Sequence, residues 1–295
     1  MRCVVTAGFL FACTLAGALA NAAGIDWTRV GEALGRPGTV LPGNVYKAGF
    51  PRTDLKVTVD GIAIKPALAL GSWVAFQPTG SDAMCMGDLA LTEREVSPVM
   101  KRLIDGGFNI TAVHNHLLRA LPAVVYMHFS AHGDPVALAH TLHAALALSH
   151  TPLAPPRTSL PAPVALDTAA LDNALGFKGS ANGGVYQFSV PRSDVIFEGS
   201  MTIPPSMGTA IAINFQPTGR GEAATTGDFV LLGTEVQPVL QALRGRGIEV
   251  TALHSHMIGE EPHLYFVHFW AHGNALDLAR GLRAALDRVN VKGIP

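Results

Sequence analysis

The chain has 295 residues, of which 48% are hydrophobic and 15% charged, and its formal net charge at pH 7 is −1. This composition excludes a disordered chain and leaves room for one large folded domain or two of ordinary size. The near-neutral charge offers no basic surface, so we expect neither nucleic acid nor an anionic membrane surface as a partner.

The first 22 residues have the pattern of a signal peptide. Arg2 precedes an apolar run, Val4 to Leu19, and Ala18-Leu19-Ala20 is a small-x-small cleavage signal before Asn21. That run is short for a membrane span, and no later run replaces it. We therefore expect an exported, soluble mature protein, periplasmic or secreted, without a lipid anchor. Its single cysteine, Cys85, is more typical of a core residue than of a functional thiol.

The remainder of the chain contains one pattern twice, at an offset of about 140 residues. Pro51-Arg52-Thr53-Asp54 matches Pro191-Arg192-Ser193-Asp194, and Phe76 to Gly80 matches Phe215 to Gly219. A proline-rich stretch between the copies is typical of a linker. The predicted organisation is a signal peptide (1–22), repeat 1 (23–148), a linker (149–165) and repeat 2 (166–295).

Each repeat predicts the same order of elements. A short amphipathic helix opens it, three strands follow, and a Gln-Pro-Thr-Gly turn ends the third strand. A helix, two strands and a closing helix complete the repeat. Asp88 and Asp228 follow a glycine before the central helix, where a capping role is expected. The predicted fold class is α+β, with a mostly antiparallel sheet and a ferredoxin-like strand–helix–strand–strand–helix core. In repeat 1 the expected strands are 45–50, 55–64 and 73–76, and the central helix includes 96–103.

Eight of the twelve histidines lie in one spacing that occurs in both repeats. The spacing is His-x-His, eleven residues, a histidine, three residues and a last histidine. Residues two or four apart on a strand share a face, and a hairpin would place His254 opposite His268 and His114 opposite His128. Imidazoles at such distances suit a transition metal, with zinc and copper as the favoured ions. The candidate ligands are His114, His116, His128, His132, His254, His256, His268 and His272.

Other polar residues extend this hypothesis. Glu260 and Glu261 at the predicted turn, and Glu235 on the preceding helix, are candidate catalytic carboxylates, either as metal ligands or as proton carriers. Repeat 1 has Ala120 and Leu121 at the turn instead, so repeat 2 is favoured if one copy is active. Four repeated residues are candidate ligand-binding groups, although local ion pairs and turn contacts are the simpler interpretation. They are Arg52, Gln77, Arg192 and Gln216.

Several of these segments resemble the LppY/LpqO family of exported bacterial proteins. The resemblance lies in Glu235-Val236, Gly247 to Met257, Glu261-Pro262 and Phe266 to Trp270, and it extends over both halves of the mature chain. It implies an exported protein built from two copies of one domain. It implies no particular reaction, and the absence of a good lipidation box means that membrane anchoring does not carry over.

Three functions follow from these patterns. The first is an exported protein that binds a transition metal, or a small molecule through that metal. The second is a metal-dependent hydrolase or lyase of the cell envelope, with a metal-bound water as nucleophile. The third is a structural or interaction protein whose histidines are packing residues. An open coordination position beside a cleft favours the second function, and histidines bonded only to backbone carbonyls favour the third.

Overall fold

The computed structural model describes residues 24–154 and 163–293. The expected signal peptide and the middle of the expected linker lie outside the described residues. Repeat 1 begins with helix α1 and the strands β1 and β2, continues through a small insertion, and ends with the central strands and two helices. Its elements are α1 (Trp27–Leu34), β1 (Thr39–Leu41), β2 (Val45–Pro51), β3 (Thr58–Val59), β4 (Ile62–Ala63), α2 (Pro66–Ala69), β5 (Gly71–Thr79), β6 (Asp82–Thr92), α3 (Glu93–Asp105), β7 (Asn109–His114), β8 (Val124–Gly133) and α4 (Pro135–Leu146).

Repeat 2 has the same order, with a 3-10 turn in place of helix α2 and one additional short strand. Its elements are α5 (Thr168–Leu175), β9 (Ser180–Asn182), β10 (Val185–Pro191), β11 (Ile196–Glu198), β12 (Met201–Ile203), η1 (Pro205–Met207), β13 (Ala210–Gly219), β14 (Glu222–Leu232), α6 (Gly233–Arg244), β15 (Glu249–His254), β16 (Glu260–Glu261), β17 (Leu264–Asn274) and α7 (Ala275–Leu286). In the described part of the chain, no helix has both the length and the apolar character needed to cross a membrane.

Each repeat forms one six-stranded antiparallel sheet, which confirms the α+β class. The order is β1-β2-β5-β6-β8-β7 in repeat 1, and repeat 2 has the equivalent order β9-β10-β13-β14-β17-β15. The elements β6, α3, β7, β8 and α4 follow the predicted strand–helix–strand–strand–helix order. A complete ferredoxin-like order is not confirmed, since the neighbour of β6 on its other side is β5, which precedes it in the chain.

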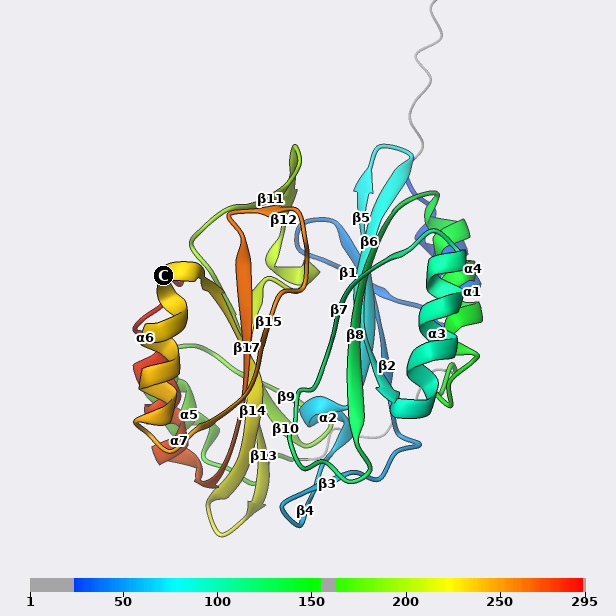
Figure 1. Cartoon of the computed structure of the whole chain (residues 1–295). Coiled ribbons are helices and arrows are strands. Elements are labelled where there is room, and N and C mark those ends of the chain that lie inside the picture. The colour runs from blue at the N-terminus through cyan, green and yellow to red at the C-terminus, as the bar shows by residue number, and fades with distance from the viewer. Residues whose placement is uncertain (1–23, 155–162, 294–295) are drawn as a thin grey trace, which may run out of the picture.

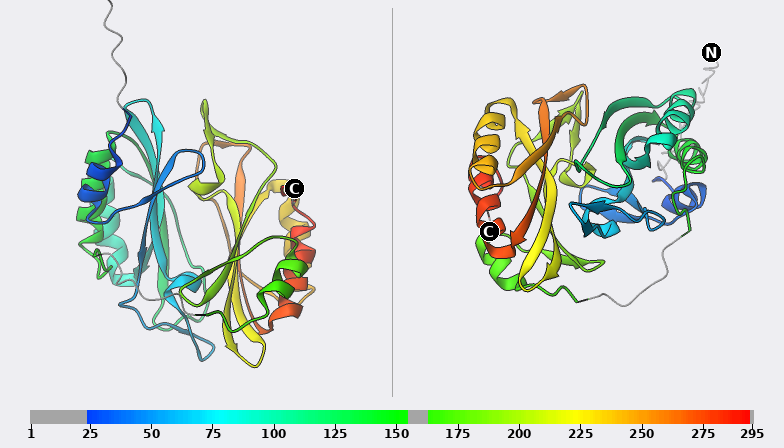
Figure 2. Two further views of the ribbon diagram at one scale, coloured as in Figure 1. Left: turned by 180° about the vertical axis from the view of Figure 1, so that it is seen from behind. Right: turned by 60° about the horizontal axis from the view of Figure 1, so that its bottom comes forward.

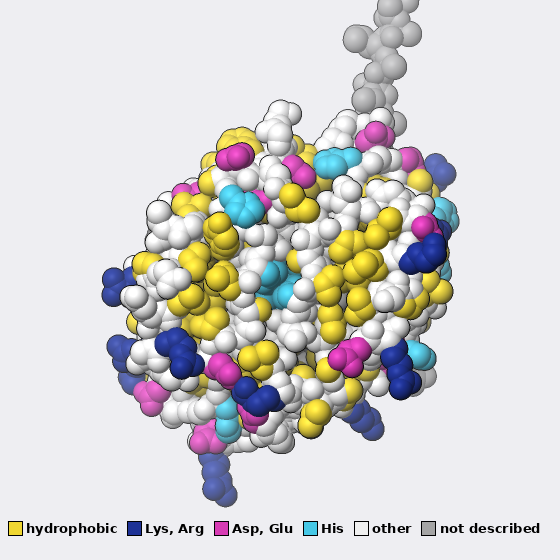
Figure 3. Space-filling model, viewed as in Figure 1, with side chains coloured by type: hydrophobic (Ala, Val, Ile, Leu, Met, Phe, Trp, Pro, Cys, Tyr) yellow, Lys and Arg dark blue, Asp and Glu magenta, His cyan; other side chains and the backbone are white. Residues whose placement is uncertain are grey.

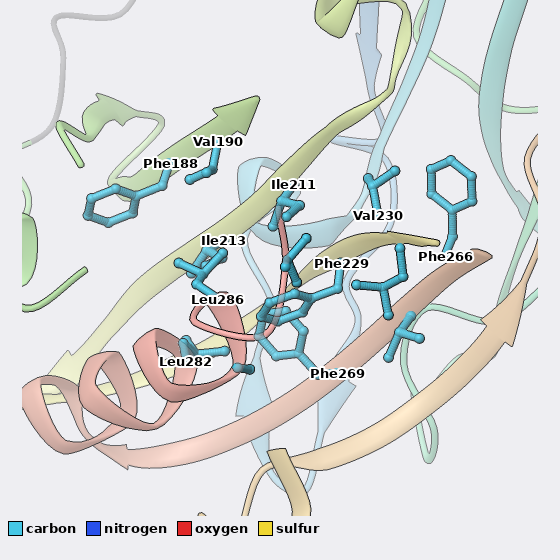
Figure 4. Close-up of a cluster of buried hydrophobic side chains, with 14 of the residues drawn as sticks. Phe188, Val190, Ile211, Ile213, Phe229, Val230, Phe266, Phe269, Leu282 and Leu286 are labelled. Atoms are coloured by element: carbon cyan, nitrogen blue, oxygen red, sulfur yellow. The ribbon is translucent and has the colours of Figure 1, made fainter. Parts of the chain in front are cut away.

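The two sheets face each other, and the helices cover their outer faces (Figure 1). Figure 2 shows the same four layers from behind and from below. In repeat 2 the outer face of the sheet packs on α7 through aromatic and branched side chains such as Phe229, Phe269 and Leu282, all fully buried (Figure 4). Burying side chains of this size is the main stabilising contribution to such a layer. Because the helices cover the apolar outer faces, the inner faces of the two sheets contact each other and carry polar groups.

The helix predictions are confirmed. Asp26 and Asp167 accept backbone N–H bonds at the starts of α1 and α5, and Asp134 and Asn274 do so for α4 and α7. At the start of α3, the Thr92 N–H donates to Glu95 Oε2 over 2.8 Å, as the predicted capping box requires.

Two strands of each sheet are missing from the prediction, the short edge strands β1 and β9 and the central strands β6 and β14, and the strands expected at 55–64 and 195–203 are the hairpins β3–β4 and β11–β12. The segments around Asp88 and Asp228 are not helix entries but the middles of β6 and β14, the fourth strand of each sheet in the orders given above. Every residue of β6 from Ala83 to Leu91 is buried, since helices cover one face and the other repeat covers the second. A strand buried on both faces loses the alternation of polar and apolar residues that identifies a strand in sequence.

Candidate metal centre between the repeats

Six histidines, three from each repeat, meet between the two facing sheets. Figure 3 shows histidine side chains at the centre of one face of the molecule, between the hydrophobic surfaces of the two repeats. His114 and His254, the last residues of β7 and β15, stack with ring centroids 3.6 Å apart. The remaining four pair across the repeats: His116 lies 3.9 Å from His268 and His128 lies 3.7 Å from His256, again between ring centroids.

The register of the histidine strands differs from the prediction. His268 pairs with Ala252, and His254 pairs with Phe266, so the expected pairing of His254 with His268 is wrong. The cause is the position of the turn, because the pairing is centred on Glu260 and not on Glu261, which moves each partner by two residues. A β-bulge at Thr251 adds one residue to β15 further from the turn, and repeat 1 has the same bulge at Thr111. The rings of His254 and His268 are still 4.9 Å apart, since diagonal neighbours on a sheet also come within reach.

The bulges also connect the repeats. Thr251 Oγ1 donates to the backbone carbonyl of His116 over 2.7 Å, and Thr111 Oγ1 donates to that of His256 over 2.6 Å. His116 and His256 follow the ends of their strands, where no sheet partner holds the backbone. Each repeat therefore fixes the His-x-His segment of the other.

Asp88 and Asp228 lie beside the histidines. Asp88 Oδ2 is 3.4 Å from His116 Nε2, and Asp228 Oδ2 is 3.4 Å from His256 Nε2. Burial raises the pKa of Asp88 to about 6, although His128 and Lys47 act to lower it. Burial and the charge of Asp88 raise the pKa of Asp228 well above its usual range. The repeated Gly-Asp pair was the available sequence signal for these two residues, and the capping role expected for them is wrong.

The imidazoles are held in their neutral form. Burial is the largest cause and lowers the pKa of His116 to about 3. Burial and repulsion between neighbouring imidazoles lower the pKa values of His114, His254 and His256. A neutral imidazole has a free lone pair on one ring nitrogen, which is the form that binds a metal.

Four groups of three side chains bring their ligand atoms within 4.8 Å of one another. Three of the groups consist only of histidines, and two of these combine both repeats. The groups are His114, His128 and His254; His114, His116 and His268; His254, His256 and His268; and Asp88, His116 and His128.

The structure places the last histidine of each pattern outside this cluster. His132 and His272 share a face with His128 and His268, as expected, but four residues along a strand correspond to about 13 Å. Both side chains are exposed, at 52% and 38%, and their neighbours are Glu198 and Glu222.

The three candidate glutamates lie outside all four groups. Glu260 is buried in β16, where its Oε1 accepts the Leu264 N–H over 2.8 Å, and Glu261 beside it is exposed. Glu235 Oε2 accepts from Arg192 and from the backbone N–H of Leu232, each over 2.7 Å.

The candidate arginines and glutamines make contacts within the protein. Arg52 is fully buried between Asp54 and Glu95, and Arg192 lies in the same way between Asp194 and Glu235. The glutamines connect the repeats: Gln77 Nε2 donates to Thr202 O over 2.8 Å, and Gln216 Nε2 donates to Ala63 O over 2.7 Å.

A cleft of about 1510 Å³ opens beside the cluster, between the two sheets. His116, His128, His256 and His268 lie on its wall together with the two aspartates, Lys47 and Trp73. The Lys47 ammonium lies 3.9 Å from the centroid of the Trp73 ring, and burial lowers the pKa of Lys47 to about 8. The histidine cluster is thus reachable by a small molecule.

Comparison with known proteins gives a family but no activity. No curated protein matches the chain. Two solved structures are similar over 84% of the chain, at TM-scores too low to support an argument. One is a trimeric bacterial microcompartment shell protein, PduB, with 12% identity, 87% of its chain covered and a TM-score of 0.21. The other is EtuB from Clostridium kluyveri, with 9% identity, 90% covered and a TM-score of 0.19.

The family comparison confirms the two-copy organisation expected from the sequence. One family, described as "Domain of Unknown Function (DUF1259)", matches residues 28–148 and again residues 169–288. The two matches correspond to the two sheets with their helices, and the LppY/LpqO name is not part of the match. The chain belongs to the DUF1259 family and contains two copies of its domain.

Proposed function

We propose that this protein binds a transition-metal ion through histidines of both repeats. The observation that supports this most directly is the 3.3 Å distance between Nε2 of His114 and Nε2 of His268. Two imidazole nitrogens at ~2.0–2.1 Å from one tetrahedral zinc ion lie about 3.3 Å from each other. The distance also suits a hydrogen bond, so the remaining ring nitrogens decide between the two interpretations.

Those ring nitrogens favour the metal. Among the residues that the structure describes, several of these nitrogens are buried without a hydrogen-bond partner, and an unpartnered buried polar atom costs about 1–3 kcal/mol. One hydrogen bond between His114 and His268 leaves each of the nitrogens named below unpaired, whereas a metal ion would bind one nitrogen from each coordinating ring. They are Nδ1 of His114, Nε2 of His116, Nε2 of His128, both nitrogens of His254 and both nitrogens of His256.

Two backbone carbonyls select the ring nitrogen that faces the cluster. Nδ1 of His268 lies 2.9 Å from Gly227 O, and Nδ1 of His128 lies 3.2 Å from Gly87 O. With the proton on Nδ1, each ring has its lone pair on Nε2, directed into the cluster. This arrangement orients a metal-bound histidine in many proteins. Neutral imidazoles suit zinc or copper best.

The test is elemental analysis of untagged protein, followed by titration with zinc or copper after chelator treatment. Wild type is expected to bind near-stoichiometric metal, and the double variant His114→Ala/His268→Ala is expected to bind none tightly. His132→Ala/His272→Ala is the matched control, since these residues lie on β8 and β17, which also carry His128 and His268, but outside the cluster. Tight metal binding by the first double variant, with circular dichroism like that of wild type, would contradict the proposal.

A second candidate function is metal-dependent hydrolysis or elimination, favoured by the cleft that reaches the cluster. The carboxyls on the cleft wall are Asp88 and Asp228, while Glu235 is engaged with Arg192. Asp88, with its pKa near 6, would serve as the proton carrier. A screen of esters and lactones with metal-loaded wild type and Asp88→Asn tests this function. Activity that Asp88→Asn retains in full would exclude Asp88 as that carrier.

A further inference from the structure

We propose that the cleft binds a small organic carboxylate, with its anionic group at Lys47 and its apolar body directed toward the histidine cluster. The carboxylate site stands on the geometry of Lys47 alone. The statement that the ligand's other end meets a metal rests on the function proposed above.

Neighbouring groups fix the position of the Lys47 side chain but do not neutralise its positive charge. Its Nζ donates to the backbone carbonyl of Ser206 over 3.2 Å and lies against the Trp73 ring. A lysine ammonium has three protons to donate, and these contacts use one of them in a hydrogen bond. Within the described residues, Lys47 forms no ion pair at 4.0 Å or less, although Asp88 is close enough to affect its pKa. Because a buried charge favours a partner of opposite sign, the free side of this ammonium is suited to an anion.

The second repeat has no equivalent of this cation. The position that corresponds to Lys47 is Gln187, which donates to Ala67 O over 2.7 Å and accepts from Asn182 over 3.0 Å. The other lysine on the cleft wall, Lys178, has a side chain that is 89% exposed and pairs with Asp172. Lys47 therefore gives the cleft a positive charge that repeat 2 lacks at the equivalent position.

The other charged groups on the cleft wall determine which class of anion can bind there. Asp88 lies on the same wall, close enough to Lys47 to affect its pKa, and its carboxylate would repel the second charge of a dianion such as phosphate. A monoanion at Lys47 carries no second charge for Asp88 to repel. The cleft wall also carries apolar side chains from both repeats, including Trp73, Pro204 and Ala212. The cleft exceeds the ~300–1,000 Å³ of ordinary small-molecule pockets, so a substituted aromatic or branched acid would fit.

The experiment measures binding of benzoate by calorimetry, with benzamide as the neutral analogue and inorganic phosphate as the dianion. Binding is measured with wild type, Lys47→Gln and Lys178→Gln. Lys47→Gln introduces the residue that repeat 2 has at the equivalent position, and Lys178→Gln is the matched control on the same wall. We expect benzoate to bind wild type, and Lys47→Gln to weaken it about tenfold or more, since a charge-assisted hydrogen bond is lost. Lys178→Gln and wild type should have the same affinity.

Equal binding of benzoate and benzamide, or equal affinity in wild type and Lys47→Gln, would overturn the proposal. Tighter binding of phosphate than of benzoate would show that the cleft selects dianions and would overturn it as well. Each titration is repeated with chelator-treated protein and with His114→Ala/His268→Ala. Benzoate binding that persists without metal supports the Lys47 site even if metal binding fails. If the protein binds metal but does not bind benzoate, the carboxylate site is contradicted and the metal proposal is not.

Discussion

The Thr251 hydroxyl of repeat 2 donates to the backbone carbonyl of His116 in repeat 1, over 2.7 Å. Thr111 and His256 make the same contact in the opposite direction, over 2.6 Å. The two threonines are the extra residues of the two β-bulges, so a local irregularity of one strand positions a candidate ligand of the other repeat. The metal centre therefore depends on how the repeats dock.

Replacing both threonines by valine tests this dependence. Thr111→Val/Thr251→Val preserves side-chain shape and removes both hydroxyls, so each histidine segment loses its anchor. We expect zinc affinity to fall about 10–100-fold, the range typical of residues that orient metal ligands, while stoichiometry stays unchanged. Calorimetric titration measures both quantities. Thr202→Val, on an exposed side chain of β12, is the control and should bind zinc as wild type does. Unchanged affinity in the double variant would show that the hydroxyls do not position the site.

A methyl group added at Gly227 should disrupt the site by displacing the strand that supports His268. A Cβ at this position would lie 1.9 Å from the Ala212 carbonyl oxygen, so the β13–β14 pair must move. The Gly227 carbonyl, which holds Nδ1 of His268, would move with it. We expect Gly227→Ala to lower both stability and metal affinity, measured by urea unfolding and zinc titration. Gly273→Ala is the control, because its Cβ would meet no atom within 4 Å. Equal effects of the two substitutions would contradict this explanation.

The metal-free protein should lose stability in mild acid. The folded state lowers the pKa of His116 from 6.5 to about 3, so the unfolded chain binds more protons between these values. The contribution of neutral His116 to the free energy of unfolding is therefore fully present above about pH 6.5. It is lost progressively as the pH falls toward about 3. Urea unfolding of chelator-treated protein at pH 7, 6, 5 and 4 measures the slope. His116→Gln removes one titrating group and should reduce that slope, whereas His140→Gln, exposed on α4, should not.

Arg192 is expected to contribute to the stability of the fold and not to metal binding. Its guanidinium is buried between Asp194 and Glu235, and removing one partner of a buried ion pair typically costs about 3–5 kcal/mol. We expect Arg192→Ala to lower the free energy of unfolding by a similar amount. Zinc stoichiometry of the folded protein should be unchanged. Arg280→Ala, which removes an exposed pair with Asp277, should cost less than about 1 kcal/mol. Loss of zinc from folded Arg192→Ala would instead connect this residue to the site.

Much of the fold was predictable because its signals are local. Helix periodicity, the caps at Asp134 and Asn274, and the internal repeat all depend on neighbouring residues, and the structure confirms them. The strand β6 was not predicted, since a strand covered on both faces has no alternating pattern to detect. Asp88 was consequently assigned to a helix entry.

The candidate site was predictable in composition but not in arrangement. Histidine spacing identified the six residues that meet, together with two that lie further along their strands. It did not indicate that His114 would stack on His254, because this contact joins positions 140 residues apart and depends on the packing of two sheets. The bulges at Thr111 and Thr251 likewise have no distinctive residue type, and each adds one unpaired residue to its strand.

The reciprocal contacts between the repeats have the form of a two-fold symmetric dimer joined into one polypeptide. In a dimer of identical subunits, any substitution appears on both sides of the interface at once. A single chain removes that restriction. Lys47 could arise without a second lysine at Gln187, and Glu260 could be present where repeat 1 has Ala120. The tandem arrangement thus allows one half to specialise in recognising a ligand while both halves continue to supply histidines.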